Sequence, residues 1–214
     1  SSKNSVRSIV PRIYGGGLSF FNKKSLGVQI VGIDPNVEKQ GTSIHKRLTQ
    51  GEYFQSQNQN VAIIGKAVSN ILDISVGEDI ILISQGADGS VANDLFKVKG
   101  VIGSTSNGTD SYRVYLPIDV AQEFFSLYDQ VHELSIHLHN INQARSFSQS
   151  YKLKDDLVIR PWQEVEADFF KAMETDKKGN NITLFIIMLI VGISILTTVL
   201  MSTLERTKEF GVLK

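Results

Sequence analysis

Two histidines spaced two residues apart are the first side chains in this sequence that could do chemistry. His137 and His139 share one face of a strand that the alternation of residues predicts from Val131 to Leu138. Two imidazoles on one face could bind a metal ion with a third ligand from elsewhere in the chain. The opposite face is apolar and consists of Leu134, Ile136 and Leu138. The histidines are therefore predicted to lie on a solvent-exposed face, and no metal site is predicted.

Carboxylates gather in two places, at Asp155-Asp156 and at Glu164, Glu166 and Asp168. General acid–base catalysis requires carboxylates held at a defined separation inside a pocket. The spacing of these residues is instead typical of the solvated face of a helix. We therefore predict no catalytic residue among them.

Motifs for nucleophilic catalysis and for nucleotide binding are missing. The sequence contains no Gly-x-Ser-x-Gly elbow and no Gly-x-x-x-x-Gly-Lys-Ser/Thr phosphate loop. Gly15-Gly16-Gly17 is not followed by a lysine, so we predict a turn between strands at Val6–Ile13 and Leu18–Phe21. We therefore expect that the chain is not an enzyme and that it binds no cofactor. Any ATP hydrolysis is then expected on a separate partner subunit.

The composition excludes several other classes of function. The chain has 214 residues with 22 basic and 22 acidic side chains, so its formal net charge is zero. This balance provides no basic surface for nucleic acid. The absence of cysteine excludes disulfides, thiolate catalysis and cysteine-based zinc sites. Residues 1–181 are numerous enough to bury a sizeable core, as one domain or as two small lobes.

The residues from Ile182 to Leu204 form one apolar run of 23 residues without a charge. As a helix this run would span about 35 Å, against roughly 30 Å of hydrocarbon in a bilayer. A buried core helix is the alternative, but such helices rarely lack charge over this length. We therefore predict a transmembrane helix. Small and hydroxyl-bearing residues in it would pack against other membrane helices, namely Gly192, Ser194, Thr197, Thr198 and Ser202.

The charges on either side of the run indicate its orientation only weakly. Lys177 and Lys178 precede it, and three basic residues follow it, Arg206, Lys208 and Lys214. The positive-inside rule favours a cytoplasmic C-terminus, although a folded domain of this size is translocated largely regardless of charge. The first residues include neither Met nor an apolar signal region, so the natural protein is expected to continue upstream.

Strands and helices mix without strict alternation before the apolar run, which predicts the α+β class. Further strands are predicted at Leu26–Ile33, Val61–Gly65, Ile80–Ser84, Phe96–Lys99, Tyr112–Leu116 and Leu157–Ile159. Helices are predicted at Val37–Leu48, Lys66–Leu72, Ile141–Tyr151 and Trp162–Met173, and one more begins at Pro117. The stretch from Gln85 to Asp94 is polar and contains glycine, so a loop is predicted there.

The ten residues from Glu205 to Lys214 carry the most specific signal. They read as a charged stretch, an acidic residue, an aromatic residue, Gly and a final aliphatic–Leu–basic run. This pattern resembles the segment after the second transmembrane helix in ABC transporter permeases of the FtsX, MacB and lipoprotein-releasing (LolC/LolE-like) family. The chain would then be a fragment that starts after the first transmembrane helix and ends after the second.

Motifs earlier in the chain agree with this resemblance in their order. They are Gly32-Ile33-Asp34-Pro35, Ile63-Ile64-Gly65, Val76-Gly77-Glu78-Asp79, Phe96–Val101, Val114–Pro117 and Trp162. Each motif is loose by itself. Together with the terminal segment they extend the resemblance over nearly the whole chain.

The resemblance implies a two-lobed MacB-like extracytoplasmic domain in which a smaller lobe is inserted into a porter-like lobe. The porter-like lobe is expected at residues 1–60 and 116–176, and the inserted lobe at 61–115. The transmembrane helix is expected at 182–204, and residues 205–214 would start a cytoplasmic coupling segment. Residues 1–181 would be periplasmic, and the helix would lie in the bacterial inner (plasma) membrane.

The resemblance also implies partners and site residues. The expected partners are a cytoplasmic ABC ATPase subunit, a second permease copy or paralogue, the membrane, and a periplasmic carrier or lipoprotein. The residues expected to couple to the ATPase are Glu205, Arg206, Lys208, Glu209, Phe210 and Gly211. A stalk helix is expected to use Trp162, Val165, Phe169 and Met173. A loop for a partner or substrate is expected to use Gln85, Gly86, Asp88, Gly89 and Asp94.

Three functions compete at this point. The resemblance implies a permease that moves lipoprotein, lipid or amphiphile by mechanotransmission from the ATPase to the extracytoplasmic domain. The subunit of that family that recruits a periplasmic carrier has a long loop with proline, whereas Gln85–Asp94 is short and has none, so carrier recruitment is doubtful. An FtsX-like regulator of an extracytoplasmic enzyme is the second function, and an unrelated membrane sensor is the third.

Overall fold

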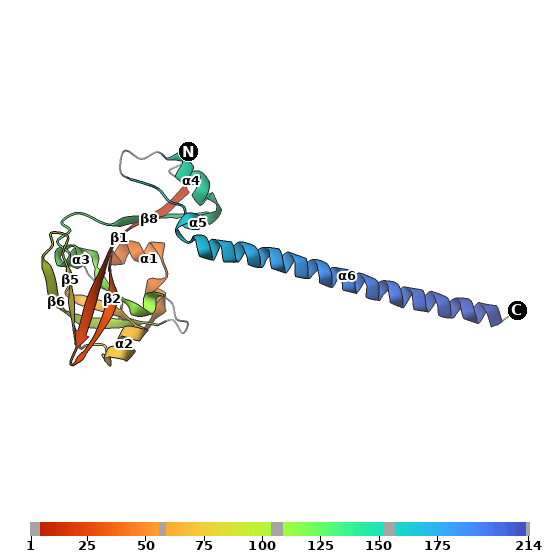
Figure 1. Cartoon of the computed structure of the whole chain (residues 1–214), viewed down its shortest axis with the longest axis horizontal. Helices are drawn as coiled ribbons and strands as arrows, with labels where there is room; N and C mark the ends of the chain where they lie inside the picture. Colours follow the sequence, from red (N-terminus) through yellow and green to blue (C-terminus); the bar gives the residue numbers. More distant parts are fainter. Residues whose placement is uncertain (1–4, 56–58, 104–108, 152–156, 213–214) are drawn as a thin grey trace. The chain divides into compact units, whose positions relative to one another are not determined.

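A computed structural model of the chain describes residues 5–55, 59–103, 109–151 and 157–212 (Figure 1). The chain divides into two compact units, Ser1–Ile141 and Asn142–Lys214, which are described separately below. The first unit contains every strand that the structure describes, and the second contains only helices and irregular segments. This mixture confirms the predicted α+β class.

Within its described residues, the first unit contains eight strands, three short helices and short 3-10 turns. The strands are β1 (Val6–Phe21), β2 (Lys24–Ile33), β3 (Leu48–Gly51), β4 (Val61–Gly65), β5 (Asp79–Gln85), β6 (Val91–Ile102), β7 (Arg113–Pro117) and β8 (Glu133–Leu138). The helices are α1 (Pro35–Gly41), α2 (Lys66–Leu72) and α3 (Ile118–Phe124). The 3-10 turns are η2 (Ile44–Arg47), η3 (Thr109–Tyr112) and η4 (Ile141–Gln143), the last of which ends in the second unit.

Strand pairing closes six of these strands into a small barrel. The ring runs β1-β2-β7-β4-β6-β5 and returns to β1, whose residues 17–20 pair with both β2 and β5. β8 pairs with the N-terminal half of β1 and extends from the barrel as a ribbon, and β3 pairs with β6. α2 and α3 lie at opposite ends of the barrel (Figure 1). Strands from residues 61–115 pair with strands before and after them, and the bounds of the two lobes stay a prediction.

Alternation along the strands separates an inner core from an outer one. In β7, Val114 and Leu116 belong to the inner cluster, whereas Tyr115 between them belongs to the outer cluster. This is the period of two that a strand with both faces covered requires. The inner cluster includes Ile13, Ile30, Ile64, Leu72, Leu82, Phe96, Val98, Val101, Phe124 and Phe125. The outer cluster consists of Val31, Ile33, Ile44, Phe54, Ile63, Ile102 and Tyr115.

The predicted turn at Gly15-Gly16-Gly17 is wrong, because β1 runs through all three glycines. The ring of Phe125 occupies the space that a Cβ on Gly15 would need. A Cβ on Gly17 would lie 2.8 Å from both the Ile30 Cδ1 and the Ile83 carbonyl oxygen, whereas Gly16 faces open space. Glycine at positions 15 and 17 therefore permits close packing inside a strand, which is a different use from turning the chain.

Of four other predicted elements, two have the observed bounds and two do not. The predicted helix Lys66–Leu72 and strand Val61–Gly65 have the observed bounds. The helix predicted at Val37–Leu48 starts earlier, because Asp34 caps it by accepting bonds from the backbone N–H groups of Asn36 and Val37. It ends at Gly41, and η2 follows. The strand predicted at Leu157–Ile159 is irregular backbone in the structure.

Asp110 joins η2 to η3 and β7. Its Oδ1 accepts hydrogen bonds from Arg113 Nη1 at 2.7 Å and from the Tyr115 hydroxyl at 2.8 Å, and its Oδ2 accepts one from Arg47. Burial acts to raise the pKa of Asp110, but the bonds from Tyr115 and Arg47 and the two guanidinium charges outweigh it. The pKa therefore lies below its usual value.

The two neighbouring glycines of β1 provide a matched test of the packing. Gly15→Ala should lower the stability of the first unit by about 1–3 kcal/mol, because the new methyl group displaces the buried Phe125 ring. Gly16→Ala should leave stability unchanged or raise it slightly, because its Cβ meets open space. Denaturant unfolding of the full chain in detergent, followed by tyrosine fluorescence, measures both. Equal stability of the two variants would contradict the packing described here.

Replacement of Asp110 is expected to lower the stability of the first unit at neutral pH. Asp110→Asn should destabilise the first unit by about 1–3 kcal/mol at pH 7, because three donors lose a charged acceptor. Since the folded pKa lies below the ordinary value of 3.8, the contribution is present above that value and is lost as the pH falls through the folded pKa. The difference between wild type and variant should therefore narrow below about pH 4. The exposed Asp129→Asn is the control.

Candidate functional site

The turn between β5 and β6 is the outermost part of the predicted partner loop. Gly86 donates its backbone N–H to the Ser90 carbonyl at 2.9 Å, and Gly89 donates to Gly86 at 2.9 Å. Asp88 Oδ1 accepts from the backbone N–H of Ser90 at 3.0 Å and from its hydroxyl at 2.6 Å. These bonds from Ser90 lower the pKa of the fully exposed Asp88 carboxyl. The turn therefore presents an ionised carboxylate on a backbone that is bonded to itself.

A second contact fixes this turn to the end of α3. The backbone N–H of Ala87 donates to the Phe125 carbonyl at 2.8 Å. Two side chains near this contact are unusually exposed for apolar residues, Val91 at 78% and Tyr128 at 76%. An acidic turn with an exposed aromatic and an exposed aliphatic residue has the composition of a protein-contact surface. We call residues 86–91 and 125–128 the hairpin surface.

The predicted loop Gln85–Asp94 is wrong in its bounds. Gln85 is the last residue of β5 and pairs with Val91, the first residue of β6. Asp94 lies inside β6 opposite Leu82, and its Oδ1 accepts from the backbone N–H of Leu95 at 2.7 Å. Most residues at the start of β6 are exposed, so polar residues can occupy a strand there. The polar residues were interpreted as a loop, but they belong to the ends of two paired strands that are exposed to solvent.

The predicted stalk helix Trp162–Met173 is interrupted. α5 (Trp162–Val165) ends at Glu166, whose φ of −109° and ψ of 49° are not helical, and α6 (Ala167–Val212) follows. Trp162 is half-buried and Val165 is 63% exposed. Phe169 and Met173 lie in α6, and their side chains are outside the described part of the structure. The single apolar stripe predicted across this stretch is therefore divided between two helices.

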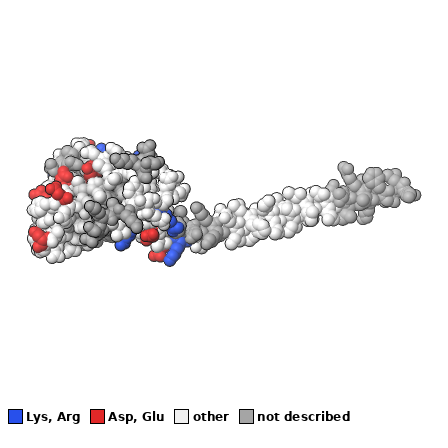
Figure 2. Space-filling view, turned by 90° about the horizontal axis from the view of Figure 1, so that it is seen from above, with Lys and Arg blue, Asp and Glu red and all other residues white. Residues whose placement is uncertain are grey.

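α6 is a 46-residue helix whose apolar part is long enough to cross a membrane. The candidate span is Gly179–Met201, three residues earlier than the span predicted from the sequence. None of this span is buried, and Figure 2 shows it as a continuous uncharged surface. Isoleucine, leucine and phenylalanine side chains that are half exposed or more require lipid or other helices around them.

Hydroxyl groups in the span are bonded within the helix. Thr183, Ser194, Thr197 and Thr198 each donate to the carbonyl four residues earlier, at 2.9–3.0 Å. This arrangement satisfies the hydroxyl groups without a neighbour, as a lipid-facing helix requires. The prediction that small and hydroxyl residues contact other helices is not tested by these bonds.

The residues predicted to couple to an ATPase are helical in the structure. Glu205, Arg206, Lys208, Glu209, Phe210 and Gly211 all lie in α6. Their side chains are outside the described part of the structure, so their role stays a prediction.

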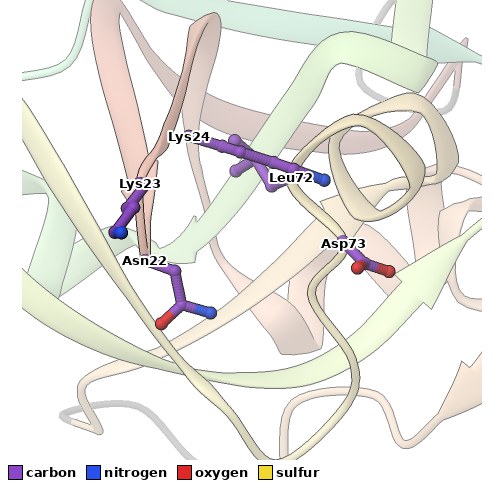
Figure 3. Close-up of a pocket in the computed structure, with 5 residues that line it drawn as sticks. All are labelled: Asn22, Lys23, Lys24, Leu72 and Asp73. Carbon is purple, nitrogen blue, oxygen red and sulfur yellow. The ribbon is translucent and has the colours of Figure 1, made fainter.

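Metal and ligand chemistry finds little support in the described residues. Among them, no group of three His, Cys, Asp or Glu side chains is placed to bind a metal. His137 is half-buried and His139 is exposed. A hollow of about 530 Å³ is lined by Asn22, Lys23, Lys24, Leu72 and Asp73 (Figure 3). Only Leu72 among them is buried and the other four side chains are exposed, so this hollow is open to solvent.

A buried ionic contact was not predicted from the sequence. Glu38 of α1 is fully buried, and its Oε1 accepts from Arg12 Nη2 at 2.7 Å and from Thr42 Oγ1 at 2.7 Å. The two charged residues are 26 positions apart, and a glutamate on a short helix is ordinarily predicted to be exposed. One available signal was Arg12 itself, a charge that stands between Pro11 and Ile13 in a mostly apolar stretch.

Comparison with known proteins identifies a matching family and several similar structures. Residues 2–150 match the family described as "MacB-like periplasmic core domain". The extracellular domain of the noncanonic ABC-type transporter YknZ from Gram-positive bacteria has a similar structure, with a TM-score of 0.51 and 14% identity. The match covers 69% of this chain and 73% of the YknZ domain.

Two further solved structures are similar at lower scores. The periplasmic region of MacB from Actinobacillus actinomycetemcomitans has a TM-score of 0.47 and 15% identity, over 70% of this chain and 68% of that one. A domain of a putative permease from Porphyromonas gingivalis has a TM-score of 0.42 and 12% identity, over 68% and 62%. The comparison with curated proteins finds no match.

The family match extends over more than half of the chain and includes the whole of the barrel. The structure adds one helix that is long and apolar enough to anchor the domain in a membrane. The chain therefore belongs to the family of MacB-like periplasmic core domains, the extracytoplasmic part of ABC-type transporter permeases.

Proposed function

We propose that this chain transmits movement across a bacterial inner membrane as part of an ABC transporter permease. ATP hydrolysis on a separate cytoplasmic subunit would move the C-terminal end of α6, and α6 would move the extracytoplasmic side. The cargo class that we propose is lipoprotein, lipid or amphiphile. Residues 1–181 lie outside the cytoplasm in this proposal, and a second permease copy or paralogue completes the complex.

The continuity of α6 is the observation that supports this proposal. At about 1.5 Å per residue, a helix of 46 residues is roughly 70 Å long. That is more than twice the thickness of the hydrocarbon core, so the helix extends beyond the span at both ends. Every backbone group within a continuous helix is bonded along its axis, so displacement of one end displaces the other.

The two ends of α6 differ in the contacts that we propose for them. Glu205, Arg206, Lys208 and Glu209 would pair with the ATPase, and Phe210 and Gly211 would pack against it. At the other end, the Trp162–Val165 helix and the first turns of α6 would act as the stalk, with Phe169 and Met173 on it. Glu166 between α5 and α6 is then the place where the direction of movement changes.

The hairpin surface is the proposed contact with a partner or substrate outside the cytoplasm. Its turn spans only residues 86–90 and contains no proline, so we propose that it contacts a partner laterally and does not enclose a carrier protein. We also propose residues 61–115 as the inserted lobe, since this segment supplies both strands of the hairpin.

Regulation of an extracytoplasmic enzyme is the second candidate function. The hairpin surface favours it, because Tyr128, Val91 and the ionised Asp88 suit contact with a folded protein better than contact with an acyl chain. Membership of the permease family argues against the third candidate, an unrelated sensor.

A proline in α6 should separate ATP hydrolysis from movement. The chain has no cysteine, so Asn70→Cys provides one exposed labelling site for each permease copy. Electron–electron distance measurements between two copies, in the complex with its ATPase, should show an ATP-dependent shift. Asp176→Pro should abolish this shift while hydrolysis continues, because proline breaks the helix before the span at a cost of about 3 kcal/mol.

Asp176→Ala is the matched control, because it removes the same charge and keeps the helix. It should retain the full distance shift. A normal shift in Asp176→Pro would contradict transmission through α6, and loss of the shift in Asp176→Ala would assign the effect to the carboxylate.

Photo-crosslinking from both ends should identify the partners. A photoreactive residue in place of Lys208 should capture a cytoplasmic ABC ATPase, and one in place of Ala87 should capture a lipidated molecule if the permease transports such cargo. A probe at the exposed Lys171 is the control and should not capture the ATPase. Capture of a hydrolase alone at position 87 would replace transport by regulation. Absence of any ATPase product at position 208 would contradict the coupling role.

A further inference from the structure

The contact between α1 and the ribbon of β1 and β8 contains a charged side chain, Glu38, that is shielded from solvent. The Glu38 side chain is fully buried, and one of its oxygens accepts both the Arg12 and the Thr42 bonds. Its other oxygen, Oε2, is buried without a hydrogen-bond partner in the described residues. An ion pair of this kind holds its position only while each charge remains balanced.

His137 packs against the end of the same helix. It is in β8 opposite Ser8 of β1, and its Nε2 is 3.5 Å from the hydroxyl of Ser135. Its ring also approaches the end of α1, where the Cδ2 atom is 3.3 Å from the position of a Cβ on Gly41. The imidazole is therefore packed between the ribbon and the helix.

The charges that face His137 are mostly positive. β1 contributes Arg12 and Arg7, and α1 contributes Glu38, whereas no charged residue of β8 is among the groups that act on His137. Burial lowers the pKa of His137 below the ordinary value of 6.5, and the two arginines lower it further against the opposing effect of Glu38. The ring is consequently neutral at pH 7.

We propose that α1 is held on the β1–β8 ribbon by an acid-sensitive latch, in which protonation of His137 places a poorly solvated positive charge against the end of α1. The new charge would be desolvated by the packing of α1 and repelled by Arg12 and Arg7. Separation of α1 from the ribbon returns the imidazolium to water, so protonation loosens α1. Because α1 leads directly into η2, whose Ile44 belongs to the outer hydrophobic cluster, loosening α1 also exposes that cluster.

Tyr53 is excluded as the trigger. Its hydroxyl is buried near the same carboxylate, but burial together with the charges of Glu38 and Asp34 raises its pKa, so it stays neutral over the whole range considered. The Lys39 ammonium lies 5.3 Å from the centre of its ring, which anchors Tyr53 against α1.

The direction of the effect follows from linkage. A histidine whose folded pKa is depressed binds fewer protons in the folded state than in the unfolded state. Stability is therefore complete above the ordinary pKa of 6.5 and is lost as the pH falls below it. The latch should be closed at neutral pH and should open in mildly acidic surroundings.

Hydrogen exchange of the full chain in detergent micelles tests this proposal. The informative amides are those of Glu38, bonded to the Asp34 carbonyl, and of Thr42, bonded to the Glu38 carbonyl. After correction for intrinsic chemistry, exchange in α1 should become several-fold faster at pH 5.5 than at pH 7.5, while the β1–β2 hairpin serves as the internal reference. Unchanged α1 protection between the two pH values overturns the proposal.

Variants separate His137 from other titrating groups. His137→Gln should make α1 protection independent of pH, and Glu38→Gln should leave α1 poorly protected at both pH values. His139→Gln, at an exposed position just after β8, should behave as wild type. Persistence of the full pH effect in His137→Gln overturns the proposal.

A measurement on the wild-type chain avoids dependence on variants that fail to fold. Exchange at the C2 position of the His137 imidazole should titrate with a midpoint below 6.5. A midpoint at or above that value means that the folded protein does not resist protonation of His137, and the latch is then contradicted.

Discussion

The first unit depends on the pairing of one strand. β1 is 16 residues long and supplies backbone partners to β2, β5 and β8, so it both closes the barrel and starts the ribbon. A barrel closed in this way has no free edge along the ring, which removes the hazard of pairing with other chains. Glycines at the centre of β1 make the closure possible, because the Phe125 ring and the Ile83 carbonyl approach the backbone there.

Local patterns were enough to predict most strands but not their connection. Val61–Gly65 and Lys66–Leu72 were predicted with the observed bounds, because alternation and helical spacing are properties of neighbouring residues. The glycine run was misassigned because its meaning depends on Phe125, more than a hundred positions away. The closed ring likewise depends on pairings between distant segments that no single stretch of sequence reports.

The candidate sites likewise include features that were predicted from the sequence and features that were missed. The apolar span and the residues of the outer hairpin were predicted from composition, although Asp94 is in a strand and the stalk is broken at Glu166. The Arg12–Glu38 and Asp110–Arg47 contacts were missed, because each joins charges that ordinary patterns place in solvent. Burial of such charges is settled only when the elements carrying them pack together.

The hydroxyl groups of α6 have a consequence for how the helix can move. Since Thr183, Ser194, Thr197 and Thr198 are already bonded to carbonyls of their own helix, rotation of α6 about its axis would break none of these bonds. The hydroxyl protons are therefore not shared with neighbouring helices, and the dispersion contacts between packed helices change gradually with angle. Torque as well as axial displacement could therefore pass through the bilayer along this one helix.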